Sequence, residues 1–330
     1  MKKLRVALVC NTRKTDDEFE VEYDPPETIE RIMRGIESSG HKALFIEADE
    51  SAYEQIVKLK PDLVFNRAEG IRGESRESHI PAFLEMLGVP YVGSNVITTA
   101  ICLDKAMTKT VLSFHKVNTP KFQVFEKEDE KLDFNLSFPL ILKPIHEGSS
   151  IGINEDNVVP NEEALSRKLS GMLLKYKEPI LAEEFIEGRE LSIGLLGNEN
   201  LEVLPILEID FSKFPKELGT VYGQKAKTAF DSSKNYICPA KLSEEKRKKI
   251  KDLAVRSFRA LRCKDFARID VRMNRFGKLF VLEANPLPGL DYDVEKDELS
   301  FYPIMAIAAG MTYNEMIRRL LITAIERYGL

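Results

Sequence analysis

Two polar runs near the end of the chain carry the residue types that bind a divalent metal ion beside a phosphate. Arg268 and Asp270 alternate on one predicted strand, and Glu283 and Asn285 alternate on the next, with a turn over 274–277 between them. Because side chains alternate across a strand, antiparallel pairing would bring Asp270, Glu283 and Asn285 together. These hard oxygen donors suit Mg²⁺, which completes its shell with water and phosphate oxygens. A ladder of cross-strand salt bridges would use the same residues.

A loop rich in glycine and serine over 143–152 follows an apolar strand predicted over 139–143. Glycines allow backbone N–H groups to approach phosphate oxygens closely, so the loop suits a phosphate cradle. The Walker and dinucleotide-binding glycine patterns are both absent. An ordinary hairpin turn is the alternative interpretation.

Two further segments combine turns with chemistry-bearing groups. The run 182–190 places carboxylates beside apolar Phe185 and Ile186, a mixture that suits a nucleoside, although a hairpin with a solvated acidic face has the same composition. The run 286–290 is a proline- and glycine-rich turn. The N–H of Gly289 there could face a reacting carbonyl oxygen, and a plain turn is again the alternative.

The elements that must position these groups follow two patterns. Short β-rich runs alternate with amphipathic stretches over the first hundred residues, which predicts a parallel sheet with helices over 26–38 and 52–59. A helix over 96–115, a small α+β lobe and a second strand-rich lobe follow, and a helix over 314–328 closes the chain. Its apolar residues, Met316 to Ala324, recur at helical spacing and are predicted to be core.

Composition excludes several classes of protein. The 330 residues predict about two domains, and 43% hydrophobic with 31% charged residues excludes a disordered chain. The formal charge of −5 argues against a nucleic-acid partner. No membrane-length apolar stretch and no signal segment are present, so we expect a cytoplasmic protein without a membrane partner. The four cysteines lack metal or disulfide spacing and are expected to be reduced.

Taken together, these motifs resemble the ATP-grasp superfamily, and within it D-alanine:D-alanine ligase and its relatives. The resemblance extends over nearly the whole chain and rests on short motifs in the family's order, which lie at 73–74, 88–94, 103–105, 142–152, 183–190, 227, 238–240, 267–271 and 282–289. It implies an α/β protein with α+β lobes in a three-lobed ATP-grasp fold. The lobes would be an N-terminal parallel-sheet lobe over 1–100, a central lobe over 101–187, and a C-terminal lobe over 188–330 that carries the metal and catalytic residues.

The resemblance also implies an ATP site between the central and C-terminal lobes. Lys105 and Lys143 would contact phosphates, and the loop with Glu147, Ser149 and Ser150 would close over them. The adenine segment would comprise Glu183, Glu184, Phe185 and Ile186, with Glu183 meeting the adenine amino group, and Glu190 would meet the ribose hydroxyls.

The catalytic groups implied by the resemblance surround this nucleotide. Asp270, Glu283 and Asn285 would hold two Mg²⁺ ions, or Mn²⁺ in their place. Arg268 and the Gly289 backbone would stabilise an oxyanion, Ser149 would position substrate, and Lys227 matches the lysine of a mobile loop. The implied enzyme is an ADP-forming, homodimeric ligase of cell-wall peptidoglycan synthesis that activates a carboxylate as an acylphosphate, with amino acids as substrates.

The chain departs from the family where amino acids should bind. The family's N-terminal glutamate motif is missing over 11–27, and Glu20, Glu22 and Asp24 are the candidates to replace it, with Glu22 predicted to contact substrate beside Glu74. Thr228 follows Lys227 where the family has tyrosine. Ser300 matches the serine that meets the second substrate's carboxylate, but the 291–299 stretch is longer than usual.

Three functions therefore remain open at this stage. The first is D-alanine:D-alanine ligation or a closely related reaction. The second is ligation of other amino acids in dipeptide or peptidic natural-product synthesis. The third is a non-catalytic ATP sensor, which the presence of Arg268 with Asp270, Glu283 and Asn285 disfavours.

Overall fold

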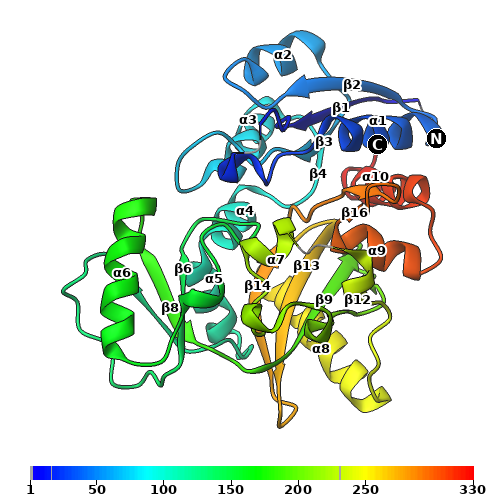
Figure 1. Cartoon of the computed structure of the whole chain (residues 1–330). Helices are drawn as coiled ribbons and strands as arrows, with labels where there is room; N and C mark the ends of the chain where they lie inside the picture. Colours follow the sequence, from blue (N-terminus) through cyan, green and yellow to red (C-terminus); the bar gives the residue numbers. More distant parts are fainter. Residues whose placement is uncertain (1–2, 16, 230–231) are drawn as a thin grey trace.

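The computed structural model describes residues 3–15, 17–229 and 232–330. Its strands form three main sheets, with the N-terminal sheet at the top of Figure 1 and the other two below it. A small two-stranded sheet of β15 (Tyr292–Asp293) and β16 (Glu298–Leu299) lies beside them. The mixed α/β architecture predicted from the sequence is therefore confirmed.

The first sheet is parallel, with the strand order β2-β1-β3-β4. Its elements are β1 (Arg5–Cys10), α1 (Pro26–Ser38), β2 (Lys42–Glu47), α2 (Ala52–Leu59), β3 (Leu63–Arg67), α3 (His79–Leu87) and β4 (Tyr91–Val92). Both helices predicted for this part have the expected bounds, and Pro26 occupies the first turn of α1, where a missing N–H costs nothing.

The second sheet is antiparallel and has the order β5-β8-β6-β7. Its elements are β5 (Phe122–Phe125), β6 (Leu140–Pro144), β7 (Val158–Val159), α6 (Glu162–Tyr176) and β8 (Ile180–Glu184). Helix α6 packs its apolar face on this sheet and closes a separate hydrophobic core.

The third sheet is antiparallel and has the order β12-β11-β9-β13-β14, with β10 beside β9. Its elements are β9 (Gly188–Leu196), β10 (Glu202–Val203), β11 (Leu207–Ile209), β12 (Tyr236–Ile237), β13 (Phe266–Asn274) and β14 (Leu279–Asn285), with α7 (Gln224–Ala229), α8 (Glu244–Ala260), α9 (Phe301–Ala308) and α10 (Tyr313–Tyr328). The closing helix is core as predicted, since Ile317, Leu320 and Leu321 are fully buried.

The last helix, α10, packs on the first helix, α1. The contact is close, because a Cβ added at Gly35 of α1 would lie 2.8 Å from the Ile317 side chain of α10. The two termini lie on this side of the molecule in Figure 1. None of the helices in the described part of the chain is both long and apolar enough to cross a membrane.

The predicted helix over 96–115 is wrong as a single element. It divides at Asp104 into α4 (Val96–Leu103) and α5 (Lys105–Phe114). The extended Asp104 backbone ends α4, and its carboxylate accepts hydrogen bonds from the N–H groups of Ala106 and Met107 as the N-cap of α5. The break places Lys105 at the first position of α5.

Candidate active site

A cleft with about 580 Å³ of space, part of it open to solvent, lies between the second and third sheets. It is lined from one sheet by Lys143, Glu183 and Glu184, and from the other by Glu190, Asp270 and Glu283. Ser150, Phe185 and Ile186 complete the predicted residues that line it. The second and third sheets therefore bring residues from the predicted phosphate, nucleoside and metal segments to one cavity.

The predicted oxygen ligands come together on β13 and β14. Asp270 pairs with Glu283 in the antiparallel register, and Arg268 pairs with Asn285. The Asn285 amide donates to Asp270 Oδ2 at 3.1 Å and to Glu283 Oε1 at 3.4 Å. Ser192, which the sequence analysis missed, donates its hydroxyl to Asp270 Oδ1 at 2.6 Å from the neighbouring strand β9.

The two carboxylates of this cluster differ in charge balance. Burial and the neighbouring Glu283 raise the pKa of Asp270 to about 6, although Arg268 donates to both of its oxygens. Burial also opposes the charge on Glu283, but Lys105, Arg268 and Lys143 outweigh it and lower its pKa to about 2. Glu283 is therefore ionised far below neutral pH, whereas the pKa of Asp270 lies only about one unit below it, and a bound cation would lower that pKa.

Mg²⁺ fits this set of donors. The buried Asp270 carboxylate, the partly exposed Glu283 carboxylate and the Asn285 amide oxygen match its preference for a few oxygen ligands, with phosphates and water completing the shell. In the described residues, no three His, Cys, Asp or Glu side chains are grouped for metal binding.

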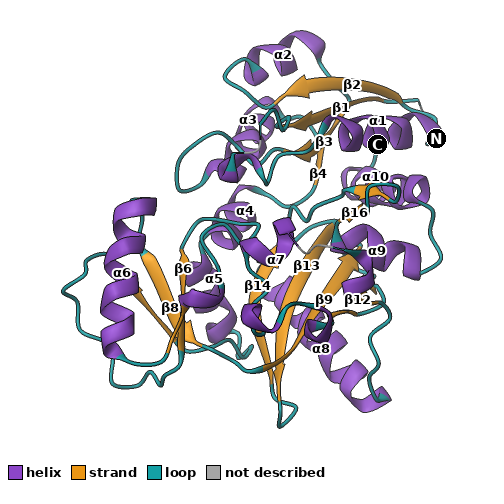
Figure 2. Cartoon of the chain, in the orientation of Figure 1, coloured by secondary structure: helices purple, strands orange, loops and turns teal. Residues whose placement is uncertain are grey.

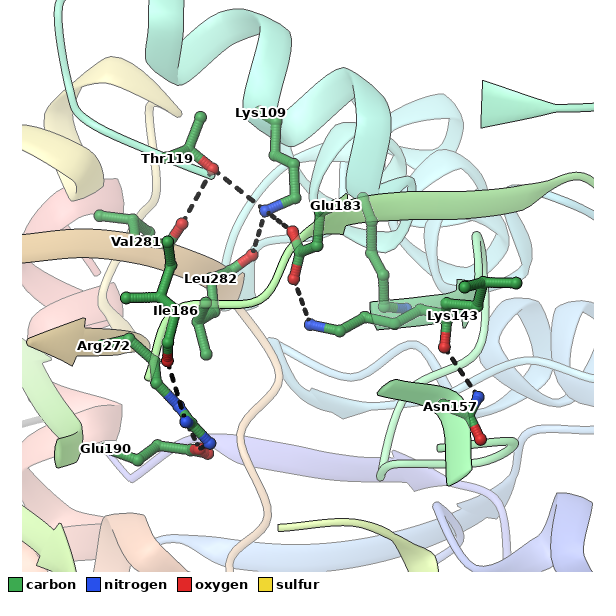
Figure 3. Close-up of polar contacts among 12 residues, drawn as sticks. Lys109, Thr119, Lys143, Asn157, Glu183, Ile186, Glu190, Arg272, Val281 and Leu282 are labelled. Carbon is green, nitrogen blue, oxygen red and sulfur yellow. Dashed lines mark hydrogen bonds and ion pairs between the residues drawn. The ribbon is translucent and has the colours of Figure 1, made fainter. Parts of the chain in front are cut away.

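Glu183 lies between two lysines in the floor of the cleft (Figure 3). Its carboxylate forms ion pairs at 2.6 Å with both Lys109 and Lys143, and its side chain is only 1% exposed. Lys109 also donates to Thr119 Oγ1 at 3.0 Å and to the Leu282 carbonyl at 3.1 Å. Glu183 therefore orients Lys143, and its predicted contact with an adenine remains a prediction.

The loop predicted to cover phosphates has an unusual backbone. Ser149, Ser150 and Gly152 have φ values of +45°, +62° and +71°, in the left-handed region that non-glycine residues seldom adopt. The Ser150 hydroxyl donates to the Tyr222 carbonyl at 3.0 Å. Lys105 donates to the carbonyls of Ile145 and Glu147, which ties the start of α5 to this loop. Strain of this kind clusters at ligand-binding loops.

His146 connects this loop to Asp104. Its Nδ1 lies 2.9 Å from Glu178 Oε2, and its Nε2 lies 3.7 Å from Asp104 Oδ2. Burial lowers its tendency to be charged, but the two carboxylates outweigh burial and raise the pKa of His146 to about 9. The charged imidazole therefore holds the N-cap of α5 beside the 143–152 loop.

Replacing His146 with Gln should flatten the dependence of stability on pH. A raised pKa in the folded state stabilises the protein fully below pH 6.5, and this stabilisation is lost as the pH rises through about 9. The wild-type protein should therefore exceed the variant in Tm by at least ~3 °C at pH 6, and the difference should shrink by pH 10. Thermal unfolding of both proteins across this range is the measurement, and a constant difference would contradict the prediction.

The N-terminal part of the chain places Glu22 against the 143–152 loop. Arg76 donates to Glu22 Oε2 at 2.7 Å, to the His146 carbonyl at 3.0 Å and to Glu147 Oε2 at 3.4 Å. A Cβ at Gly148 would collide with the Glu22 carboxylate, so the loop packs directly on it. Of the three N-terminal candidates, Glu22 is the one that packs on the 143–152 loop.

The other N-terminal acids have different surroundings. Glu20 accepts from the N–H groups of Lys14 and Thr15, and buried Asp24 pairs with Arg67 at 3.0 Å. Glu74 is exposed, and no hydrogen bond or ion pair joins it to another described residue. The nearby Glu69 and Glu77 are buried instead. Burial and the Glu22 charge raise the pKa of Glu77 to about 8, and burial and the Glu77 charge raise that of Glu69.

Gly289 and Ser300 meet at the turn after β14. A Cβ at Gly289 would lie 2.5 Å from Ser300 Oγ, so only glycine allows this contact. The Ser300 hydroxyl donates to Asp291 Oδ2 at 2.8 Å, and Thr28 donates to Asp291 Oδ1 at 2.7 Å. The hydroxyl predicted to meet a substrate carboxylate is therefore bound to a carboxylate of the chain itself.

Lys227 lies on α7, with its ammonium 5.6 Å from the centre of the Tyr222 ring. Tyr222 lines the cleft, so the structure places Lys227 near its edge. Thr228 follows on the same helix, but its side chain lies outside what the structure describes.

Comparison with known proteins identifies the family. The family model "D-ala D-ala ligase C-terminus" matches residues 108–322. An uncharacterized protein of Sinorhizobium fredii, y4sG, is 34% identical over 98% of both chains, and the D-alanine–D-alanine ligase of Aquifex aeolicus is 32% identical over 95% of this chain and 98% of its own. The crystal structure of the Bacillus anthracis D-alanine–D-alanine ligase complexed with ATP covers 99% of each chain with a TM-score of 0.76 at 22% identity, which shows the same fold. The chain belongs to the D-alanine–D-alanine ligase family of ATP-grasp proteins.

Proposed function

We propose that the protein is an ATP-dependent, ADP-forming carboxylate–amine ligase, with D-alanine:D-alanine ligation as its leading activity. Family membership supports the reaction class. The observation that carries the proposal is the convergence of Asp270, Glu283 and Asn285 with Arg268, next to two buried lysines. A carboxylate is a poor electrophile, so ATP converts it to an acylphosphate, and an amine then displaces phosphate to form the amide.

The residues of the chain have distinct roles in this reaction. Lys105 and Lys143 offset charge on the transferring phosphoryl group, and a divalent ion held by Asp270, Glu283 and Asn285 would supply further charge neutralisation. Arg268 and the Gly289 N–H stabilise the oxyanion formed when the amine attacks, and losing one such donor costs ~10²- to 10³-fold in rate. Glu190 binds the ribose, Glu22 the donor amino group, and Ser149 positions the donor.

Family membership also supports further parts of the proposal. These are the use of two Mg²⁺ ions, or Mn²⁺, a homodimeric assembly, a cytoplasmic role in peptidoglycan synthesis, and lobes at 1–100, 101–187 and 188–330.

The direct test is release of ADP and phosphate by the purified protein with Mg-ATP. The panel contains single D- and L-amino acids, their pairs and D-lactate, with products identified by mass spectrometry. D-alanyl-D-alanine from D-alanine alone would support the leading activity. Release with a different pair would retain the ligase chemistry with another substrate, and bound ATP without release from any pair would contradict the proposal.

Ser300 and Asp291 favour a second candidate function, ligation to a different acceptor. A substrate carboxylate at Ser300 would face the Asp291 carboxylate, and like charges in contact cost several kcal/mol. The second candidate is therefore a ligase whose acceptor carries no free carboxylate at this point.

Replacing Asp291 with Asn should shift the choice of acceptor. With D-alanine as donor and equal D-alanine and D-alaninamide as acceptors, the variant should increase the share of D-alanyl-D-alanine at least ~10-fold, because the repelling charge is removed. The product ratio is measured by mass spectrometry. The control is Asp293→Asn in the same segment, which should leave the ratio unchanged. The Asp293 carboxylate lies 3.8 Å from the Arg31 guanidinium. An unchanged ratio in Asp291→Asn would place the acceptor elsewhere.

A further inference from the structure

Arg272 is a buried cation on β13 that contacts three separate segments around the cleft. Its guanidinium donates through Nε and Nη2 to Glu190 Oε2 at 3.0 and 2.6 Å, and through Nη1 to the Ile186 carbonyl at 3.1 Å. It also donates to the Thr220 carbonyl. The residue is 4% exposed, and Figure 3 shows it pointing toward Glu190 and Ile186.

The partners of Arg272 are parts of the cleft wall. Glu190 lies on β9, and Ile186 lies in the connection between β8 and β9 that joins the second and third sheets. Phe185 from this connection and Phe211 lie over the guanidinium, at 5.2 and 5.4 Å from ring centre to Cζ. One guanidinium therefore fixes a carboxylate, a connecting segment and a loop beside the same cavity.

The position of Arg272 on its strand links this anchor to the proposed metal site. Arg268, Asp270 and Arg272 alternate along β13 and so share one face of the sheet. Two residues along a strand span about 7 Å, so Asp270 and Arg272 fix the separation between the proposed metal ligand and Glu190. Among the described residues, the ion pair of Glu190 is with Arg272.

We propose that Arg272 is a positioning residue that fixes the Glu190 carboxylate toward the ribose and thereby sets the preference of the cleft for ribonucleotides. The inference rests on the proposed function, in which Glu190 accepts from the ribose hydroxyls. A carboxylate discriminates between a hydroxyl and a hydrogen only when its oxygens are held in place, since a mobile side chain can turn to water. The planar guanidinium holds Glu190 and the Ile186 carbonyl at once, and a lysine ammonium cannot reproduce this geometry.

Calorimetric titration of the full-length protein with ATP and with 2′-deoxy-ATP, without amino acids, tests the proposal. The wild-type protein should bind ATP at least ~10-fold more tightly, and Glu190→Gln should reduce this preference. Arg272→Lys and Arg272→Met should bring the ratio of the two Kd values to within about threefold of unity. Arg189→Lys is the matched control, because Arg189 on β9 pairs with Glu208 and not with Glu190, and it should keep the wild-type ratio.

The outcomes separate this inference from the reaction proposed above. A ratio that changes in Glu190→Gln but stays at the wild-type value in both Arg272 variants would overturn it. A wild-type ratio of one would also overturn it, whereas ligase chemistry is judged separately by release of phosphate. Each ratio compares two nucleotides on one protein preparation, so a smaller folded fraction in Arg272→Met does not alter it, and Arg272→Lys retains the charge.

Discussion

Replacing Asp270 with Asn is expected to lower kcat by about 10³-fold while ATP still binds. Asp270 is the centre of the oxygen cluster, since it accepts from Ser192, Arg268 and Asn285. The amide keeps the shape of the side chain but loses its charge, and a metal ion contributes several kcal/mol of charge stabilisation in such reactions. The measurements are ADP release with the best amino-acid pair, and calorimetric binding of ATP.

Glu208→Gln is the matched control for this substitution. Glu208 lies on β11 in the same sheet, and its carboxylate pairs with Arg189 instead of the oxygen cluster. The control should keep turnover within about threefold of the wild-type value. Full turnover in Asp270→Asn would exclude a catalytic role for this carboxylate. A wild-type protein that binds ATP without turnover on any substrate would instead favour the sensor.

Strand alternation made the oxygen cluster predictable from the sequence. Asp270 and Glu283 lie on strands joined by a short turn, so local periodicity and one antiparallel pairing were enough to bring them together. The Asp104 break in the helix over 96–115 also has a local signal, because aspartate is a preferred N-cap. Pro205 stands between β10 and β11 and has no N–H to donate to a sheet, which accounts for the separation of these two strands.

Other features of the site depend on contacts between distant segments. Ser192 lies 78 residues from Asp270, and Arg76 lies 54 residues from Glu22. No periodicity in the sequence specifies such pairs, because the order of the strands and the packing of the lobes decide them. Arg272 lies two residues after Asp270 in the sequence, so alternation places it on the same face of the strand, but its partner Glu190 lies 82 residues away. The sequence therefore predicted which residues of neighbouring strands come together better than it predicted the distant contacts that hold them in place.

Replacing Glu183 with Gln is expected to cause the largest loss of stability, about 3–5 kcal/mol in the free energy of unfolding at pH 7. The side chains of Lys109 and Lys143 are only 1% and 11% exposed, and Glu183 is the carboxylate that pairs with both. Gln cannot balance either charge, so two buried ammonium groups would lose the carboxylate with which they are paired. Denaturant unfolding of the wild-type and variant proteins measures the difference, and Glu187→Gln, at an exposed position in the same segment, should change stability by less than about 0.5 kcal/mol.

The dependence of this loss on pH identifies its cause. Burial already lowers the pKa of Lys109 in the wild-type protein, where Glu183 opposes that effect. Glu183 holds the pKa of Lys143 above its ordinary value. Without Glu183 the pKa of Lys109 should fall further and that of Lys143 should drop below its ordinary value, so folding releases protons and the stability of the variant rises with pH toward the unfolded lysine value. The deficit of Glu183→Gln relative to the wild type should therefore shrink between pH 7 and pH 10. A deficit that stays constant over this range would point to lost packing rather than to the two buried charges.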